Sequence, residues 1–343
     1  LSIERCGVMG KRERKVSRFT GHWITEQGAG TVEYVIVVLV AIVIGSGLLA
    51  FGNQVSGQVS KTGDSISSWF SKANGTGGTG GGNAGGGNSG TDSRIEELKE
   101  KDPADWTLDD QKAVAEDIGK KGNSSELYAK AKAAMDAGTT WSIQLTNGRT
   151  ITYKIIGIAH DDLADGTGKA GLTFLTTSYR FGRWQMNATA TNVGGWEASE
   201  LRAKMNSGEI WNILPADLQL KIENVTKLTN NVGGGKANKN AAVTATTDKL
   251  FLLSYSEIVP MSYWASDYPW TSNEGTQYEA FKGKVMNNHS VNAAIAVGGY
   301  NHWWERTVQM TATQYFLFVD DEGDPSCHGT AINTYNIFPA WCF

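Results

Sequence analysis

Acidic side chains near the C-terminal end are the first residues whose types could bind a ligand. Asp320, Asp321 and Asp324 flank Gly323 and offer the carboxylate oxygens that Ca²⁺ takes as ligands. The run lacks the regular spacing of an EF-hand loop, and its glycine equally suits a turn between two strands. The sequence therefore predicts a strand-connecting turn, with a calcium site as the alternative.

Tryptophan side chains form the second group, since their rings can either stack on sugars or fill a hydrophobic core. The sequence holds 12 of them, which is a high number for its length. Most tryptophans at this density are expected to pack inside the domain. A platform that stacks on glycans is the alternative, and its candidates are Trp264, Trp270, Trp303 and Trp304.

The three cysteines form the third group. Cys6 lies in a basic N-terminal stretch, whereas Cys327 and Cys342 lie near the C-terminus. In an exported protein the two C-terminal cysteines would form a disulfide. Such a bond would close an interval of about 15 residues and contribute about 3 kcal/mol in the chain-entropy model. Two free buried thiols are the alternative.

No motif of an enzyme emerges from the remaining residues. The five histidines show no zinc-ligand spacing, and neither a nucleophile elbow nor a phosphate-binding loop is present. A second acidic stretch, with His160, Asp161, Asp162 and Asp165, predicts a loop, again with a calcium site as the alternative. The net charge is −4 although the first 28 residues are basic, so the body is acidic and nucleic acid is not expected as a partner. We therefore expect no enzymatic activity and no cofactor.

The most apolar segment, 35–51, is the main feature of the N-terminal part. As a helix it would span about 26 Å, slightly less than the roughly 30 Å hydrocarbon core of a bilayer. No small-x-small cleavage site follows it, and no polar stripe interrupts it, which disfavours a signal peptide and a buried core helix. Basic residues precede the segment, and only Lys61 and Lys72 follow it before the glycine-rich stretch. This asymmetry predicts an N-terminus inside the cell and a C-terminal part outside.

Just before this segment, Gly28 is followed by four residues and then by Glu33 and Tyr34. This arrangement resembles a type IV prepilin signal, most closely that of tight-adherence (Flp-like, type IVb) pilins and their pseudopilin relatives. Those proteins carry a basic leader ending in glycine, then a few residues, then Glu-Tyr and an apolar helix. Here the leader ends at Gly28, and Glu33 and Tyr34 stand at the matching positions. The resemblance implies that a prepilin peptidase cuts after Gly28. Ala29 would then be the new N-terminus and Glu33 the fifth mature residue.

A carboxylate in hydrocarbon costs several kcal/mol unless it is paired. Glu33 could pair with the amino group of Ala29, in a neighbouring subunit or in its own chain, and so fix the register of packed helices. The resemblance thus implies a membrane-inserted precursor that joins copies of itself or other pilins, through the assembly machinery, in an extracellular surface filament. The alternative is a single-span anchor for an extracellular module that binds glycan or protein and never polymerises.

The chain divides into five parts by composition. A stretch with ten glycines and no charge, 75–90, indicates a flexible linker. Helical patterns follow it, the last of which closes on Gly138. After them come strand and helix patterns, including a hairpin signal at Asn147-Gly148, so the fold class is α+β. The parts are a leader 1–28, an apolar pilin helix 29–72, a linker 73–91, a short helical segment 92–138 and a surface domain 139–343.

The surface domain contains, in this order, the runs GGWEASELRAKMN, DKLFLLSYSEI, HWWERT and NIFPAWCF. This succession resembles a domain of unknown function found in exported proteins of Gram-positive gut bacteria. That resemblance implies a compact α+β fold, with a C-type-lectin-like form as one candidate, and it supplies no enzymatic activity. In a filament the domain would be displayed for adhesion to a host glycan or protein. Thr307 departs from the usual serine of the family pattern. The matching residues include Trp196, Ser199, Leu201, Arg202, Lys249, Phe251, Ser254, Glu257, Trp303, Trp304, Arg306, Pro339 and Ala340.

Overall fold

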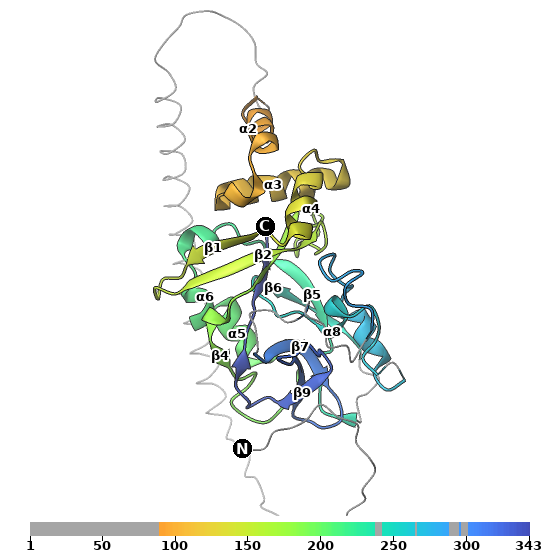
Figure 1. The fold of residues 1–343 in the computed structure, drawn as a ribbon. Coiled ribbons are helices and arrows are strands. Elements are labelled where there is room, and N and C mark those ends of the chain that lie inside the picture. The colour runs from red at the N-terminus through yellow and green to blue at the C-terminus, as the bar shows by residue number, and fades with distance from the viewer. Residues whose placement is uncertain (1–88, 237–241, 265, 288–294, 296–300) are drawn as a thin grey trace, which may run out of the picture. The chain divides into compact units, whose positions relative to one another are not determined.

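A computed structural model describes residues 89–236, 242–264, 266–287, 295 and 301–343 (Figure 1). The leader, the apolar segment and almost all of the glycine-rich linker lie outside the described residues. The predicted cleavage site at Gly28 and Ala29 therefore lies outside them, as do Glu33 and Tyr34. All of the described residues belong to one compact unit of the chain, which includes the range 87–343.

Three helices open the described part, where the sequence predicts a helical segment. They are α2 (Ser89–Glu100), α3 (Leu108–Lys121) and α4 (Tyr128–Ala137), with short 3-10 turns η1 (Pro103–Asp105) and η2 (Gly122–Ser124) between them. The side chain of Thr107 accepts the backbone N–H of Asp110, and Asp110 returns the bond, which forms a capping box at the start of α3. Gly138 ends α4 in the left-handed conformation, with φ at 67°.

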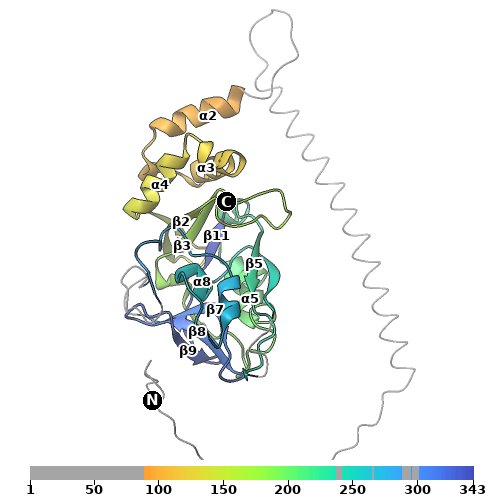
Figure 2. The same ribbon diagram turned by 90° about the vertical axis from the view of Figure 1, so that its right-hand side faces the viewer.

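The first sheet has the strand order β1-β2-β3-β11, and its neighbours are all antiparallel. The turn between its first two strands contains Gly148 with φ at 81°, in agreement with the hairpin signal. Helices α3 and α4 contact this sheet, as Figure 2 shows. The strands are β1 (Thr140–Gln144), β2 (Thr150–Ile158), β3 (Leu172–Thr176) and β11 (Ala340–Cys342).

The second sheet has the order β4-β10-β7-β8-β9, and a separate pair joins β5 to β6. The five strands are β4 (Arg183–Trp184), β7 (Trp303–Gln309), β8 (Tyr315–Val319), β9 (Cys327–Thr330) and β10 (Tyr335–Asn336). The pair is β5 (Val225–Thr229) and β6 (Thr244–Asp248). Short helical elements connect them: η3 (Tyr179–Phe181), α5 (Glu200–Asn206), α6 (Glu209–Asn212), α7 (Ala216–Gln219), α8 (Tyr255–Ile258) and η5 (Pro269–Asn273).

The C-terminal segment ties the two larger sheets together. Strand β10 belongs to the second sheet, whereas β11, which begins at Ala340, completes the first. Helices α3 and α4, both larger sheets and the β5-β6 pair contribute to one hydrophobic core. The described part is thus a single α+β body, which confirms the predicted fold class.

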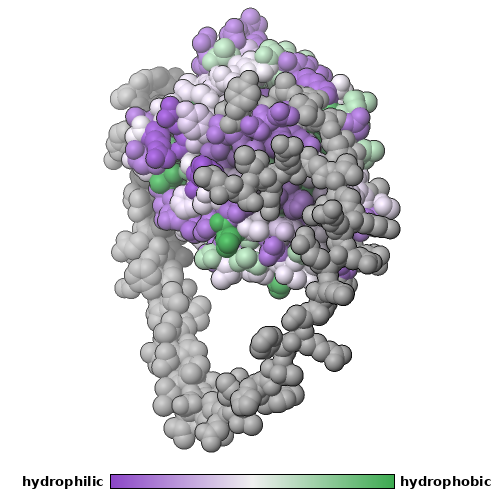
Figure 3. Space-filling model, turned by 60° about the horizontal axis from the view of Figure 1, so that its bottom comes forward, coloured by the Kyte–Doolittle hydropathy of each residue, from purple (hydrophilic) through white to green (hydrophobic). Residues whose placement is uncertain are grey.

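The surface of this body is mostly polar on the face drawn in Figure 3, with scattered hydrophobic side chains. Large hydrophobic residues that are exposed include Val193, Leu220, Met261 and Met286, and they come from separate loops and helix ends. None of the helices in the described ranges is long and apolar enough to cross a membrane.

Candidate functional site

The highest concentration of charge in the described domain lies in its interior, around Lys227 of β5. Its Nζ atom lies 2.6 Å from Oδ1 of Asp161 and 2.5 Å from Oε1 of Glu257. The hydroxyl oxygen of Tyr278 lies 3.1 Å from the same nitrogen. Arg306 completes the group through Glu257. We call Asp161, Lys227, Glu257, Tyr278 and Arg306 the buried charge cluster.

Asp161 accepts several hydrogen bonds besides the contact with Lys227. The hydroxyl of Thr173 donates to Oδ2 at 2.6 Å, and the hydroxyl of Tyr278 lies 3.0 Å from both carboxylate oxygens. The thiol of Cys342 lies 3.5 Å from Oδ2. Both oxygens are therefore saturated by donors that converge from β3, β11 and the 276–285 segment.

Glu257 and Arg306 form a bidentate pair on the other side of Lys227. Nη1 of Arg306 lies 2.5 Å from Oε2 of Glu257, and Nη2 lies 3.0 Å from Oε1. The guanidinium also donates to the hydroxyl of Thr229 and to the carbonyls of Leu252, Leu228 and Glu274. A guanidinium group whose N–H donors all have hydrogen-bond acceptors can remain charged in a site without water.

Local sequence features bring these side chains together. Lys227 lies between Val225 and Thr229 on the buried face of β5, where strand periodicity points every second side chain inward. Glu257 is the third residue of a capping box whose N-cap is Ser254, at the start of α8. Gly157 leaves room for the ring of Tyr278, since a Cβ there would lie 2.8 Å from it.

The pairing keeps all four ionisable partners charged in spite of their burial. Burial alone would raise the pKa of Asp161, but the charge of Lys227 holds this pKa well below its usual range. Burial would also raise the pKa of Glu257, but the charge of Arg306 lowers this pKa below its usual value. Burial would lower the pKa of Lys227, yet Asp161 and Glu257 raise it. Two cations and two anions leave the cluster neutral overall.

Cys342 is a free buried thiol, so the predicted disulfide between Cys327 and Cys342 is wrong. The two cysteines belong to different sheets, since Cys327 begins β9 and Cys342 ends β11. Cys342 faces Thr173 and Asp161, and burial raises the pKa of its thiol well above the usual value. The result is an unreactive packing residue at the edge of the buried charge cluster.

The tryptophans proposed as a glycan platform are mostly inside the core. Trp303 and Trp304 are 0% exposed and Trp270 is 5% exposed, so none of the three can stack on an external sugar. That prediction is wrong for them, because β7 and η5 direct their side chains inward. Trp264 is 42% exposed and lies over Tyr263, with ring centroids 5.6 Å apart.

The acidic residues after β8 order a turn. Oδ1 of Asp320 accepts the backbone N–H groups of Glu322 and Asp324, at 3.0 and 2.8 Å. Oδ1 of Asp324 accepts the N–H and hydroxyl of Ser326, while Gly323 takes φ at 89°. This geometry is that of the predicted strand-connecting turn. Asp320 and Asp324 also lie near the sulfur of Cys327, but this cysteine is disulfide-bonded and offers no thiolate to a metal ion, and Asp321 lies beside His302.

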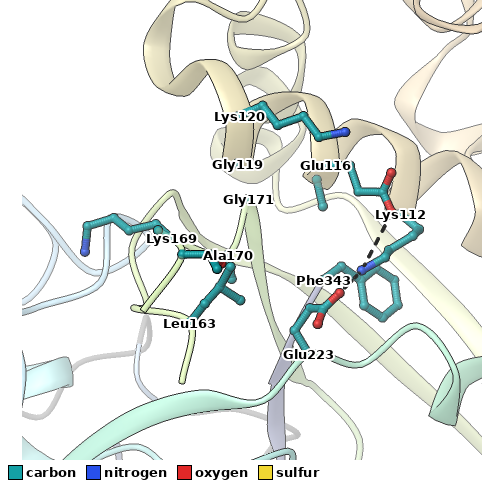
Figure 4. Close-up of a pocket in the computed structure, with 13 residues that line it drawn as sticks. Lys112, Glu116, Gly119, Lys120, Leu163, Lys169, Ala170, Gly171, Glu223 and Phe343 are labelled. Atoms are coloured by element: carbon teal, nitrogen blue, oxygen red, sulfur yellow. Dashed lines mark hydrogen bonds and ion pairs between the residues drawn. The ribbon is translucent and has the colours of Figure 1, made fainter. Parts of the chain in front are cut away.

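A surface pocket of about 380 Å³ lies between α3 and the 163–171 segment (Figure 4). Its charged groups are largely paired: Lys112 contacts Glu223 and Glu116, and Lys169 contacts Asp162. Gly119, Gly171 and the ring of Phe343 supply much of the remaining wall.

The sequence places Asp161 in a loop and assigns no role to Lys227. Glu257 and Arg306 are part of the family pattern, but nothing in their spacing shows that they form an ion pair. The one local signal is the lysine itself, which interrupts a strand pattern at a position that faces inward. A charged residue on the buried face of a strand requires an oppositely charged partner, but the sequence does not identify that partner.

Comparison with known proteins gives one match. Residues 170–343 match a family described as a domain of unknown function, DUF6273. Neither a curated protein nor a solved structure matches the chain. The matched range starts just before β3, so it includes Lys227, Glu257 and Arg306. It leaves out α2–α4, β1, β2 and Asp161, although these share the same core and complete the same cluster.

Proposed function

This chain belongs to the DUF6273 family, whose description assigns no activity, and we propose that it is a pilin-like structural subunit. A prepilin peptidase would cleave it, and its N-terminal helix would assemble into a surface filament that displays the C-terminal domain for adhesion. The observation that carries this proposal is the spacing Gly28-x4-Glu33-Tyr34 before an uninterrupted apolar segment. A basic leader on the cytoplasmic side and a glycine-rich linker after the apolar segment suit the same arrangement.

The described domain supports a display role in two ways. Its core is continuous from α2 to β11, so it is expected to stand as a folded body at the end of a flexible linker. Its strongest concentration of charge is buried and internally paired, which suits structure better than turnover. The finer fold proposal, a C-type-lectin-like form, draws support from two small, mostly antiparallel sheets joined by the C-terminal segment.

Replacing Glu33 with alanine tests this function. The Glu33→Ala variant is expected to insert into the membrane but to form no filaments, because the pairing that sets the register of packed helices is lost. Sheared surface fractions and membrane fractions, probed for the C-terminal domain and imaged by electron microscopy, give the measurement. Glu26→Ala is the matched control, since that residue lies in the leader and would be removed by cleavage.

Two outcomes would count against the proposal. Normal filaments from Glu33→Ala would show that the carboxylate does not set the register. A wild-type protein that remains in the membrane fraction and never enters a sheared filament would favour the anchored binding module instead.

A further inference from the structure

An amine and a carboxylate are held in contact inside the core, where water is excluded. The side chains of Lys227 and Asp161 are each 3% exposed, and Nζ lies 2.6 Å from Oδ1. The ring of Phe251 lies 4.2 Å from the amine, and the ring of Tyr278 also faces it. Such contact gives a very high effective concentration of the two groups, and a dry site removes the water that drives amide hydrolysis.

We propose that Lys227 and Asp161 condense into an intramolecular amide bond, with Glu257 carrying protons between them. The amine nitrogen attacks the side-chain carbonyl carbon of Asp161, a C–N bond forms, and one C–O bond of the carboxyl group breaks. The starting ammonium and carboxylate contain all the atoms of the products, which are one amide and one water. The released oxygen takes two protons from the ammonium, and the amide keeps the third, so the reaction needs no oxidant, reductant or metal.

Three contacts assign the roles of the neighbouring groups. The hydroxyls of Thr173 and Tyr278 donate to the Asp161 oxygens and would stabilise the negative charge of a tetrahedral intermediate. Oε1 of Glu257 lies 2.5 Å from Nζ of Lys227, within reach of the proton that the amine must lose. The first proton can pass directly from the amine to Asp161, and Glu257 can transfer the second.

The charge balance of the cluster explains why Asp161 reacts and Glu257 does not. Condensation with Asp161 removes one cation and one anion and leaves Glu257 paired with Arg306 by two hydrogen bonds. Condensation with Glu257 would leave the buried Arg306 guanidinium without its carboxylate partner, which is strongly unfavourable. At rest, Lys227 and Asp161 form an ion pair. The amide bond forms from the neutral amine and the protonated carboxyl group, after one proton has passed from Lys227 to Asp161.

The product would join two segments that are far apart in sequence. Asp161 follows β2, before the matched family range, and Lys227 lies in β5, 66 residues later. A covalent link at this point constrains the unfolded chain in the same way as a disulfide, but reducing agents cannot break it. This inference concerns the described domain alone and does not depend on pilin assembly.

Mass spectrometry of the denatured and reduced full-length chain tests the bond. The wild-type mass is expected to fall below the value for its determined N-terminus by the mass of one water. A tryptic digest should contain a branched peptide that joins the segment with Asp161 to the segment with Lys227. Tandem spectra must place the link at these two residues, since a succinimide at Asp165-Gly166 would also lose one water.

Three variants separate the roles. Lys227→Arg keeps the positive charge but should show the full mass and no branched peptide. Glu257→Gln should leave most of the protein unlinked, because it cannot accept the second proton. Asp161→Asn should form the same amide with loss of ammonia instead of water.

A wild-type chain with the full mass would overturn the proposal, and so would a water loss without the branched peptide. Neither result depends on whether any variant folds.

Discussion

Replacement of Arg306 by methionine is expected to lower the free energy of unfolding of the domain by about 3–5 kcal/mol. The guanidinium is fully buried and forms two hydrogen bonds with Glu257. Methionine has a similar length but no charge, so Glu257 would face Lys227 alone and the carbonyl of Glu274 would lose a donor. The loss is greater if Lys227 is consumed in an amide bond, because Glu257 then keeps no cation at all.

Urea unfolding followed by tryptophan fluorescence measures this effect. Arg180→Met is the matched control, since Arg180 is exposed and lies over the ring of Tyr179 at the surface. Its change should stay within about 0.5 kcal/mol. A small loss for Arg306→Met, similar to that of the control, would mean that the cluster is not a stabilising centre of the core.

Substitution of Glu305, the residue before Arg306, is expected to change the free energy of unfolding in the opposite direction. Glu305→Gln should raise the free energy of unfolding by about 2 kcal/mol near pH 7. Glu305 is fully buried, and neither of its carboxylate oxygens has a hydrogen-bond partner among the described residues. Burial, and then the charges of Glu274 and Asp324, raise the pKa of Glu305 well above its usual 4.5. Glutamine keeps the shape of the side chain and removes the group that must stay protonated.

The pH dependence gives the sign of this effect. A raised carboxyl pKa means that the folded state binds more protons than the unfolded state above the ordinary pKa. Stability from Glu305 is therefore complete below about pH 4.5 and is lost as the pH rises through the raised pKa of the folded state. Glu274 acts in the same direction, because burial raises its pKa to about 7.

Unfolding curves at several pH values check the prediction for Glu305→Gln. The gain over wild type should be small near pH 4.5 and should grow toward neutral pH. Glu322→Gln, in the exposed part of the turn after β8, should give no such trend. A Glu305→Gln protein that is less stable than wild type at neutral pH would show that this carboxylate has a stabilising partner.

Local signals in the sequence predicted much of the fold. The glycine after 128–137 and the Asn147-Gly148 hairpin are both short-range features, and the structure contains each of them. The mixture of these elements was sufficient for the α+β class. The acidic turn was predictable for the same reason, because its hydrogen bonds join residues two to four positions apart.

Partnerships between distant residues could not be predicted in this way. The contact of Lys227 with Asp161 crosses 66 residues, and it depends on how β5 packs against the end of β2. The cysteines show the same limit. Their spacing allowed a disulfide between them. However, β9 with Cys327 and β11 with Cys342 belong to different sheets, and Cys342 faces Asp161 instead. Spacing in a sequence constrains local geometry, whereas sheet membership depends on the whole chain.

Determination of the N-terminal residue of the surface-exposed protein tests the central claim most directly. Edman sequencing or mass spectrometry of protein sheared from cells is expected to show a chain that begins at Ala29, with Glu33 as its fifth residue. Recovery of the protein with the leader before Gly28 still attached would contradict the proposal of prepilin processing.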